Sequence, residues 1–257
     1  MTTTISNPSG AVAVVEGLNG NGLNRATEQA MSKPNPKSFE DPVRVFLRAL
    51  RKLHSLWLSW TYPFASVGRR FSVHYSCSLS RTIARYISIG NNVLIEQNCR
   101  VDVPIVREGC SPAIMIDDEC RIGQGGTILA INRIHIERDV IFGQSVLVMD
   151  HNHAFEDVTV PIALQGTTKG GTIRIEEGCW IGFGAAIVCN EGELVIGRNS
   201  VVGVNAVVTR SIPSYSVVTG NPARVVKQFD SSKGKWVLGS SAARGSEAQS
   251  QPVEVTV

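Results

Sequence analysis

Apolar residues recur at every sixth position along most of this chain, and that period constrains the fold more than any other feature. An amphipathic helix repeats about every 3.6 residues and a half-exposed strand about every two, so a six-residue step fits neither. Three such steps carry a chain once around a triangular coil, where each apolar side chain stacks on its counterpart in the next coil. The pattern therefore predicts a β-solenoid. The clearest triplets are Ile89, Ile95 and Val101; Ile116, Ile122 and Ile128; Ile136, Phe142 and Val148; Ile175, Ile181 and Ile187; and Ile196, Val202 and Val208.

The same step extends toward the N-terminus and divides the chain into four parts. Phe71, Cys77 and Ile83 continue it backwards, which gives about six coils in all. Residues 71–228 are therefore the solenoid domain, with a long loop at 149–174, and residues 38–70 hold a basic amphipathic helix and a connection. The two remaining parts are rich in small polar residues without periodicity, which predicts disordered tails. These tails are residues 1–37 and 229–257.

The composition is that of a globular protein with one sizeable core, since 43% of the 257 residues are hydrophobic and 18% are charged. No apolar run approaches about 20 residues, so no membrane span is expected. The start of the chain lacks the pattern of a secretory signal. The expected location is the cytoplasm, or peripheral attachment to the inner face of the membrane. The six cysteines show no CxxC spacing, so buried free thiols are expected.

Asp41 and Pro42 predict the start of a helix over about 42–60, because aspartate caps a helix and proline fits its first turn. Two interpretations stay open. The helix covers the end of the solenoid core or packs on another subunit, or it lies on an anionic membrane surface with Trp57 and Trp60. Nucleic acid is not an expected partner, because aromatic stacking platforms are not interleaved with the basic residues. Six basic residues and no acid lie within 42–70: Arg44, Arg48, Arg51, Lys52, Arg69 and Arg70.

The six-residue step breaks between Val148 and Ile175, which are 27 positions apart. A long loop on a rigid repeat scaffold usually carries function. This loop holds two of the five histidines, His151 and His153. An imidazole titrates near neutrality and can act as a general base. Three nearby acids are candidates to orient the ring, and the sequence does not choose between them: Asp150, Glu156 and Asp157.

Three sequence motifs follow one another in the later coils. The histidine loop follows an inward triplet, the next coil begins Cys179-Trp180-Ile181-Gly182, and the last contains Ile212-Pro213 followed by Gly220-Asn221-Pro222-Ala223-Arg224. With these features, residues 71–228 resemble the hexapeptide-repeat acyltransferases of the left-handed parallel β-helix fold. The chain is most similar to the sugar O-acetyltransferases of that family.

The resemblance implies a homotrimer that transfers an acetyl group from acetyl-CoA to a hydroxyl of a sugar or of an envelope or exopolysaccharide precursor. The active cleft would lie between subunits, and no metal or permanently bound cofactor would be needed. The hydroxyl would attack the thioester directly in a ternary complex. The resemblance places the role of catalytic base on His153, with His151 as the second choice.

The resemblance also implies contacts with both substrates. The donor contacts are Phe183, Gly184, Val204, Thr209, Arg210 and Arg224. Phe183 and Val204 are larger than the small residues of the family, whereas the arginines keep the cationic end that a phosphorylated nucleotide needs. The candidate acceptor contacts are Asp150, Asn152 and Trp180.

Two other functions stay open. A non-catalytic solenoid that serves as an assembly subunit would bind no thioester. A metalloenzyme like the γ-class carbonic anhydrases would hold zinc through His135, His151 and His153. The second is disfavoured because two of these histidines lie close together in one loop rather than on the flat faces of adjacent coils.

Overall fold

The computed structural model describes residues 3–6, 12–15, 41–106 and 112–239. The chain divides into two compact units, Met1–Phe46 and Leu47–Val257.

The first unit contains two short strands, β1 (Thr3–Ser6) and β2 (Val12–Val15), which pair antiparallel. Both lie in the range predicted as a disordered tail, residues 1–37. The rest of that range lies outside the described residues. Helix α2 (Pro42–Thr61) begins in this unit, where the Asp41 carboxylate accepts a hydrogen bond from the Val43 N–H (3.0 Å).

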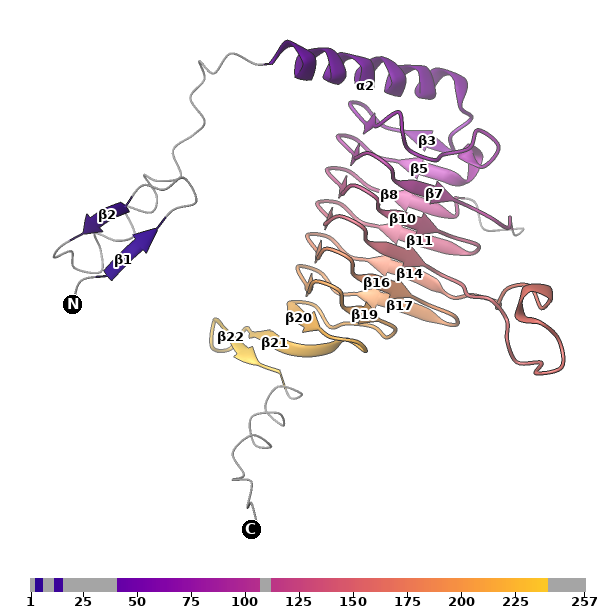
Figure 1. Cartoon of the computed structure of the whole chain (residues 1–257). Coiled ribbons are helices and arrows are strands. Elements are labelled where there is room, and N and C mark those ends of the chain that lie inside the picture. Colours follow the sequence, from indigo (N-terminus) through magenta and orange to yellow (C-terminus); the bar gives the residue numbers. More distant parts are fainter. Residues whose placement is uncertain (1–2, 7–11, 16–40, 107–111, 240–257) are drawn as a thin grey trace, which may run out of the picture. The chain divides into compact units, whose positions relative to one another are not determined.

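The second unit is a solenoid in which the chain visits three sheets in turn (Figure 1). The first sheet contains β3 (Ser66–Val67), β5 (Ile87–Ile89), β8 (Ile114–Ile116), β11 (Arg133–Ile136), β14 (Thr172–Ile175) and β17 (Glu193–Ile196). The second contains β4 (Ser72–Val73), β6 (Leu94–Ile95), β9 (Arg121–Ile122), β12 (Ile141–Phe142), β15 (Trp180–Ile181), β18 (Val201–Val202), β20 (Ser216–Thr219), β21 (Arg224–Asp230) and β22 (Lys235–Leu238). The third contains β7 (Arg100–Asp102), β10 (Thr127–Leu129), β13 (Leu147–Met149), β16 (Ala186–Val188) and β19 (Val207–Val208). Two short 3-10 helices, η1 (Ala84–Tyr86) and η2 (Ile162–Leu164), lie in connections.

Neighbouring coils pair in register, so the inward residues form apolar columns. Ile136 of β11 pairs with Ile116 of β8 on one side and with Ile175 of β14 on the other. All three side chains are buried, whereas the outward residue His135 is partly exposed. The predicted β-solenoid with a six-residue step is confirmed.

The first coil keeps the six-residue step in a different phase from the predicted one. Val67 pairs with Ile89 and Val73 pairs with Ile95, so the apolar columns begin at Val67 and Val73. The connection to the next coil contains η1 and is longer than the regular repeat. Counting backwards from Ile89 in steps of six therefore gives the wrong residues. The predicted triplet of Phe71, Cys77 and Ile83 is therefore out of phase with the columns, although Phe71 is buried in the core and the other two residues pack against it.

The part of α2 in the second unit lies against the first coil. Leu58 is buried in the apolar core, and the buried hydroxyl oxygen of Ser55 accepts a hydrogen bond from the Val73 N–H (3.0 Å). These contacts agree with the expectation that the helix covers the end of the solenoid core. None of the helices in the described parts of the chain combines the length and the apolar character that crossing a membrane requires.

The last coil continues into an antiparallel extension of the second sheet. β21 pairs with β20, and β22 pairs with β21 as far as Leu238. The rings of Phe229 and Trp236 pack edge to face across the last pair, and such cross-strand aromatic contacts stabilise antiparallel strands. The tail predicted over 229–257 therefore begins with paired strands, and its remainder from residue 240 lies outside the described residues.

Replacing Ile136 with alanine is expected to destabilise the protein by about 2–5 kcal/mol, because it leaves a cavity in a continuous apolar column. Ile141→Ala in the same coil is the matched control, since Ile141 is 47% exposed and its loss should cost about 0.5 kcal/mol. Denaturant unfolding followed by circular dichroism measures both changes. Equal losses in the two variants would contradict the inward and outward assignment.

Candidate functional site

The chain passes from the third sheet to the first along one edge of the solenoid, which we call the arm edge. Its connections in successive coils include residues 130–132, 150–171, 189–192 and 209–211. Residues 150–171 are much the longest of these connections and project from the coils (Figure 1). We call this segment the arm. It corresponds to the loop predicted at 149–174.

Asp150 fixes the base of the arm to the coil before it. Its carboxylate is fully buried and accepts hydrogen bonds from the backbone N–H groups of Ile131 (2.9 Å), Asn132 (2.8 Å) and Arg133 (3.0 Å). A carboxylate suits this position because it offers several lone pairs to converging donors and has no hydrogen of its own when ionised. The prediction that Asp150 contacts the acceptor does not agree with this burial.

His151 is buried beside Asp150, with 7% of its surface exposed. Its Nδ1 lies 3.0 Å from the Asp150 carboxylate. Because a carboxylate only accepts, Nδ1 carries the hydrogen and Nε2 remains an acceptor. Within the described residues, every buried side-chain nitrogen or oxygen has a hydrogen-bond partner. The Nε2 atom of His151 has none there. Nε2 therefore reaches the surface, and His151 is an oriented imidazole at the arm base.

His153 lies two residues further along the arm and is exposed. The returning part of the arm holds the backbone on either side of it. The Ala154 N–H donates to the Gly166 carbonyl (3.1 Å), and the Thr168 N–H donates to the Asn152 carbonyl (2.8 Å). The imidazole of His153 therefore extends from a fixed backbone and stays accessible to a ligand.

Within the described residues, no acid bonds to the His153 ring. The Asp150 carboxylate already binds backbone N–H groups and His151. The Glu156 carboxylate accepts a hydrogen bond from the Phe155 N–H (3.0 Å). Asp157 accepts bonds from the hydroxyl (2.6 Å) and the N–H (2.8 Å) of Thr159. The hydroxyl bond holds the pKa of Asp157 below its usual value. The carboxylates considered as partners for His153 thus have other partners.

A hollow of about 250 Å³ lies on the arm edge, two coils beyond the arm. Thr209, Arg210 and Arg224 line it, so three of the predicted donor contacts gather in one place. Neither arginine forms an ion pair with any acid that the structure describes. Two strand spacings put the hollow roughly 10 Å from the arm base. Two arginines that line one hollow and have no described carboxylate partner suit a phosphate.

The other predicted donor contacts lie on a different edge, where the chain passes from the second sheet to the third. Phe183 and Val204 are 49% and 61% exposed there, and Gly184 is in the same turn as Phe183. Trp180, on β15 of the second sheet, is 53% exposed. One chain does not gather these residues with the histidines, so a site built from the whole predicted set needs two chains.

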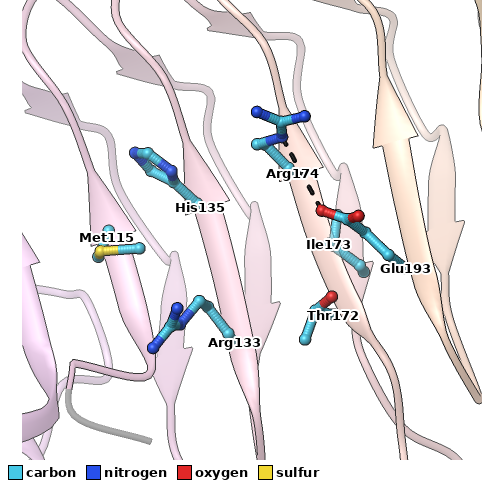
Figure 2. A pocket seen from close by; sticks show the side chains of 7 residues that line it. All are labelled: Met115, Arg133, His135, Thr172, Ile173, Arg174 and Glu193. Carbon is cyan, nitrogen blue, oxygen red and sulfur yellow. Dashed lines mark ion pairs between the residues drawn. The ribbon is translucent and has the colours of Figure 1, made fainter.

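A second hollow, of about 350 Å³, lies on the outer face of the first sheet beside the arm base (Figure 2). Arg133 and Thr172 line it at the starts of β11 and β14, directly after the arm edge. Arg174 is neutralised there by Glu176 (3.5 Å) and Glu193 (4.0 Å). This hollow was not predicted, because the inward apolar pattern carries no information about the outward side chains. The signal that could have found it is the run of polar residues at the outward positions of these strands.

The described residues contain no group of three or more His, Cys, Asp or Glu side chains arranged to hold a metal ion. His135 lies on β11, and its Nε2 is 2.9 Å from the Asp117 carboxylate. His151 and His153 lie instead at the arm base. The histidines considered as zinc ligands therefore do not meet within one chain.

Four of the five described cysteines are buried, and Cys77 is partly buried. Burial raises the pKa of the Cys120 thiol to about 12 and that of the Cys179 thiol to about 11. Such thiols stay protonated at neutral pH and are poor nucleophiles. The expectation of buried free thiols is confirmed for the buried four, and Cys110 lies outside the described residues.

Two curated relatives are named as acetyltransferases. A probable acetyltransferase of Mycobacterium tuberculosis (strain H37Rv) is 30% identical over 162 residues, which cover 63% of this chain and 49% of that protein. A protein of Escherichia coli K12, named for O-acetyl transfer in lipopolysaccharide biosynthesis, is 26% identical over 129 residues. The match covers 48% of this chain and 64% of that protein. This chain therefore spans about half the length of the first relative and less than two thirds of the length of the second. No protein-family model matches the chain.

The N-acyltransferase AntD from Bacillus cereus has a similar fold in its complex with dTDP-4-amino-4,6-dideoxyglucose and coenzyme A. The TM-score is 0.56, the identity is 20%, and the match covers 77% of this chain and 96% of that one. Over part of its length the chain is therefore similar in sequence to proteins named as acetyltransferases, and it shares its fold with a solved acyltransferase. The expected fold class, an all-β left-handed parallel β-helix with an N-terminal helix, is confirmed.

Asp150→Asn is expected to loosen the arm base, because the amide turns one acceptor oxygen into a donor that faces other donors. The loss of a hydrogen bond to a charged group should speed hydrogen–deuterium exchange of amides 131–133 about tenfold or more. Asp157→Asn is the matched control, since it removes an exposed arm carboxylate and should leave those amides unchanged. Unchanged exchange in Asp150→Asn would mean that this carboxylate does not hold the arm.

Proposed function

We propose that this protein is an acetyl-CoA-dependent O-acetyltransferase that modifies a hydroxyl of a sugar or of an envelope or exopolysaccharide precursor. One observation carries the proposal. The arm edge has an accessible imidazole at the arm base and, two coils further on, a hollow with two arginines that no described acid neutralises. An acyl-CoA holds its thioester and its phosphates at opposite ends of a long chain, so a base and an anion site spaced along one edge suit it.

In the proposed reaction, His153 accepts the proton of the acceptor hydroxyl as the hydroxyl oxygen attacks the thioester carbonyl carbon. The carbon–sulfur bond breaks, an ester forms, and the proton passes to the departing thiolate of CoA. A backbone N–H group of the next coil stabilises the oxyanion. No acyl-enzyme forms in this scheme, which agrees with the raised pKa values of Cys120 and Cys179.

His153 is proposed as the base rather than His151 because the acceptor must reach the ring. The His153 residue is exposed, whereas only 7% of His151 is exposed. In this assignment the Asp150–His151 pair holds the arm base and thereby keeps His153 in place. The opposite assignment has its own support, since Asp150 orients the His151 ring.

A sugar acceptor is supported by what the similar proteins are named for or bind. The Escherichia coli relative is named for lipopolysaccharide biosynthesis, and AntD was crystallised with a nucleotide-linked amino sugar. AntD is an N-acyltransferase, so transfer to oxygen rather than nitrogen is part of the proposal.

The proposed assembly is a homotrimer in the cytoplasm, with the active cleft between subunits. In it, the edge with Phe183, Gly184 and Val204 of one subunit faces the arm edge of the next. Trp180 and Asn152 then lie near the acceptor. This arrangement would unite the predicted contacts, which one chain keeps on separate edges.

His153→Ala is expected to lower kcat by about 10²–10⁴-fold, because the attacking hydroxyl loses its base. The KM for acetyl-CoA should stay nearly unchanged, since the imidazole does not bind the phosphates. Release of free CoA is measured with nucleotide sugars, free sugars and lipid-linked glycans as acceptors. His74→Ala in the first coil is the control and should keep full activity.

His151→Ala separates the two histidines. If His151 only anchors the arm, its loss should lower activity together with faster amide exchange at residues 131–133. Full activity of His153→Ala, with activity lost in His151→Ala, would contradict the proposed role of His153 and transfer that role to His151.

Arg210→Ala and Arg224→Ala are each expected to weaken CoA binding about tenfold, because each removes a charge-assisted contact with a phosphate. Arg174→Ala is the matched control, since that arginine lies in the other hollow and is already neutralised by acids. Isothermal titration calorimetry with CoA measures the three affinities. Equal weakening in all three variants would argue against a phosphate site at residues 209–210 and 224.

A further inference from the structure

Helix α2 turns its largest apolar side chains away from the solenoid. Within the second unit its buried residues are Ser55 and Leu58, whereas Leu53 is 62% exposed, Trp57 53% and Trp60 89%. A helix that served only to cover the core would bury such side chains, because an apolar face is what drives a helix onto a core. The exposed face indicates a second contact.

The exposed apolar residues form one continuous stripe. Leu50, Leu53, Trp57 and Trp60 are spaced three or four positions apart, so they lie above one another on a single face of the helix. The packed residues Ser55 and Leu58 lie on another face. We call the exposed set the tryptophan stripe.

The end of the solenoid that carries the tryptophan stripe is rich in basic residues. The chain from Pro42 to Ile95 contains no Asp or Glu, so no acid from this segment offsets its cations. The first acid after it is Glu96, which forms an ion pair with Arg51 (3.5 Å). The exposed basic residues of this end of the solenoid come from the helix and from the first coil: Arg48, Lys52, Arg69, Arg70, Arg81 and Arg85.

We propose that the tryptophan stripe and these basic residues dock on an anionic membrane surface, with the helix lying in the plane of the interface. Indole rings favour the boundary between headgroups and acyl chains, while arginine and lysine attract anionic headgroups. Attachment in the plane also fits the described helices, none of which is long and apolar enough to cross a membrane.

A second copy of the chain is a less suitable occupant. Two copies that met through the tryptophan stripe would bring two basic ends together. Segment 42–95 contains no acidic residue that could neutralise these charges. Like charges across an interface disfavour association. An anionic bilayer removes that conflict and accepts the apolar side chains as well.

The inference does not depend on the proposed transferase activity, because vesicle binding is measured without either substrate. If the membrane attachment and the transferase activity both hold, the attachment restricts which acceptors the active site can reach. The arm leaves the solenoid three to four coils from the helix, roughly 15–20 Å by strand spacing. That separation suits an acceptor whose sugar is linked to a lipid in the same membrane.

Flotation of the full chain with vesicles tests the proposal. Binding is expected with vesicles that contain phosphatidylglycerol in phosphatidylcholine, and little binding with phosphatidylcholine alone. Raised salt should weaken the binding because screening reduces the attraction of exposed charges. The double variant Trp57→Ser and Trp60→Ser should lower the bound fraction about tenfold, since it removes the groups that enter the interface.

Two comparison variants make the result specific. Arg69→Glu with Arg70→Glu should weaken binding to the anionic vesicles, whereas Val158→Ser removes an apolar arm residue that is 96% exposed and should change nothing. Circular dichroism checks that each variant is folded. Failure of the wild type to float, or equal flotation with both kinds of vesicle, would overturn the proposal. Loss of self-association in the tryptophan variant, without vesicle binding by the wild type, would assign the stripe to a second copy instead.

Discussion

The parallel backbone ladder between coils is the interaction on which the rest of the structure depends. It gives the N–H and C=O groups of each strand partners in the neighbouring coils, and its register stacks inward residues such as Ile116, Ile136 and Ile175. Because pairing is only between neighbours, a stack of coils has two ends where strands and core would face water. Helix α2 covers the core at one end, and β20 to β22 extend the sheet at the other.

The same ladder determines what can meet on the arm edge. Asp150 links the arm to the connection before it, so a long insertion starts from a base that three backbone N–H groups define. Arg210 and Arg224 line one hollow because β21 folds back on β20, and the Ala223 N–H bonds to the Val207 carbonyl (2.8 Å). Coil spacing therefore sets the distances between groups along the edge, and the connections supply the chemistry.

Much of this fold could be predicted because an inward column requires a large apolar residue at a fixed step. The phase of the first coil differs from the predicted phase, because the repeat does not determine the length of the connection that contains η1. The burial of Asp150 was also beyond the sequence, because a carboxylate looks the same whether it faces water or converging donors. The corner that each donor residue occupies could have been predicted. Phe183 follows an inward residue of the second sheet and Thr209 one of the third, so counting from those residues separates the two edges.

The arm edge also shows how this architecture accommodates variation. Val148 and Ile175 are 27 positions apart, whereas Ile187 and Ile196 are nine apart. The strands on either side nevertheless keep their places in two separate ladders, as β13 pairs with β16 in the third sheet and β14 with β17 in the first. The length of a connection is thus uncoupled from the geometry of the prism. An arm of different length or composition could be grafted onto this position as a cassette, provided that its first residue still supplies a buried acceptor to the turn below.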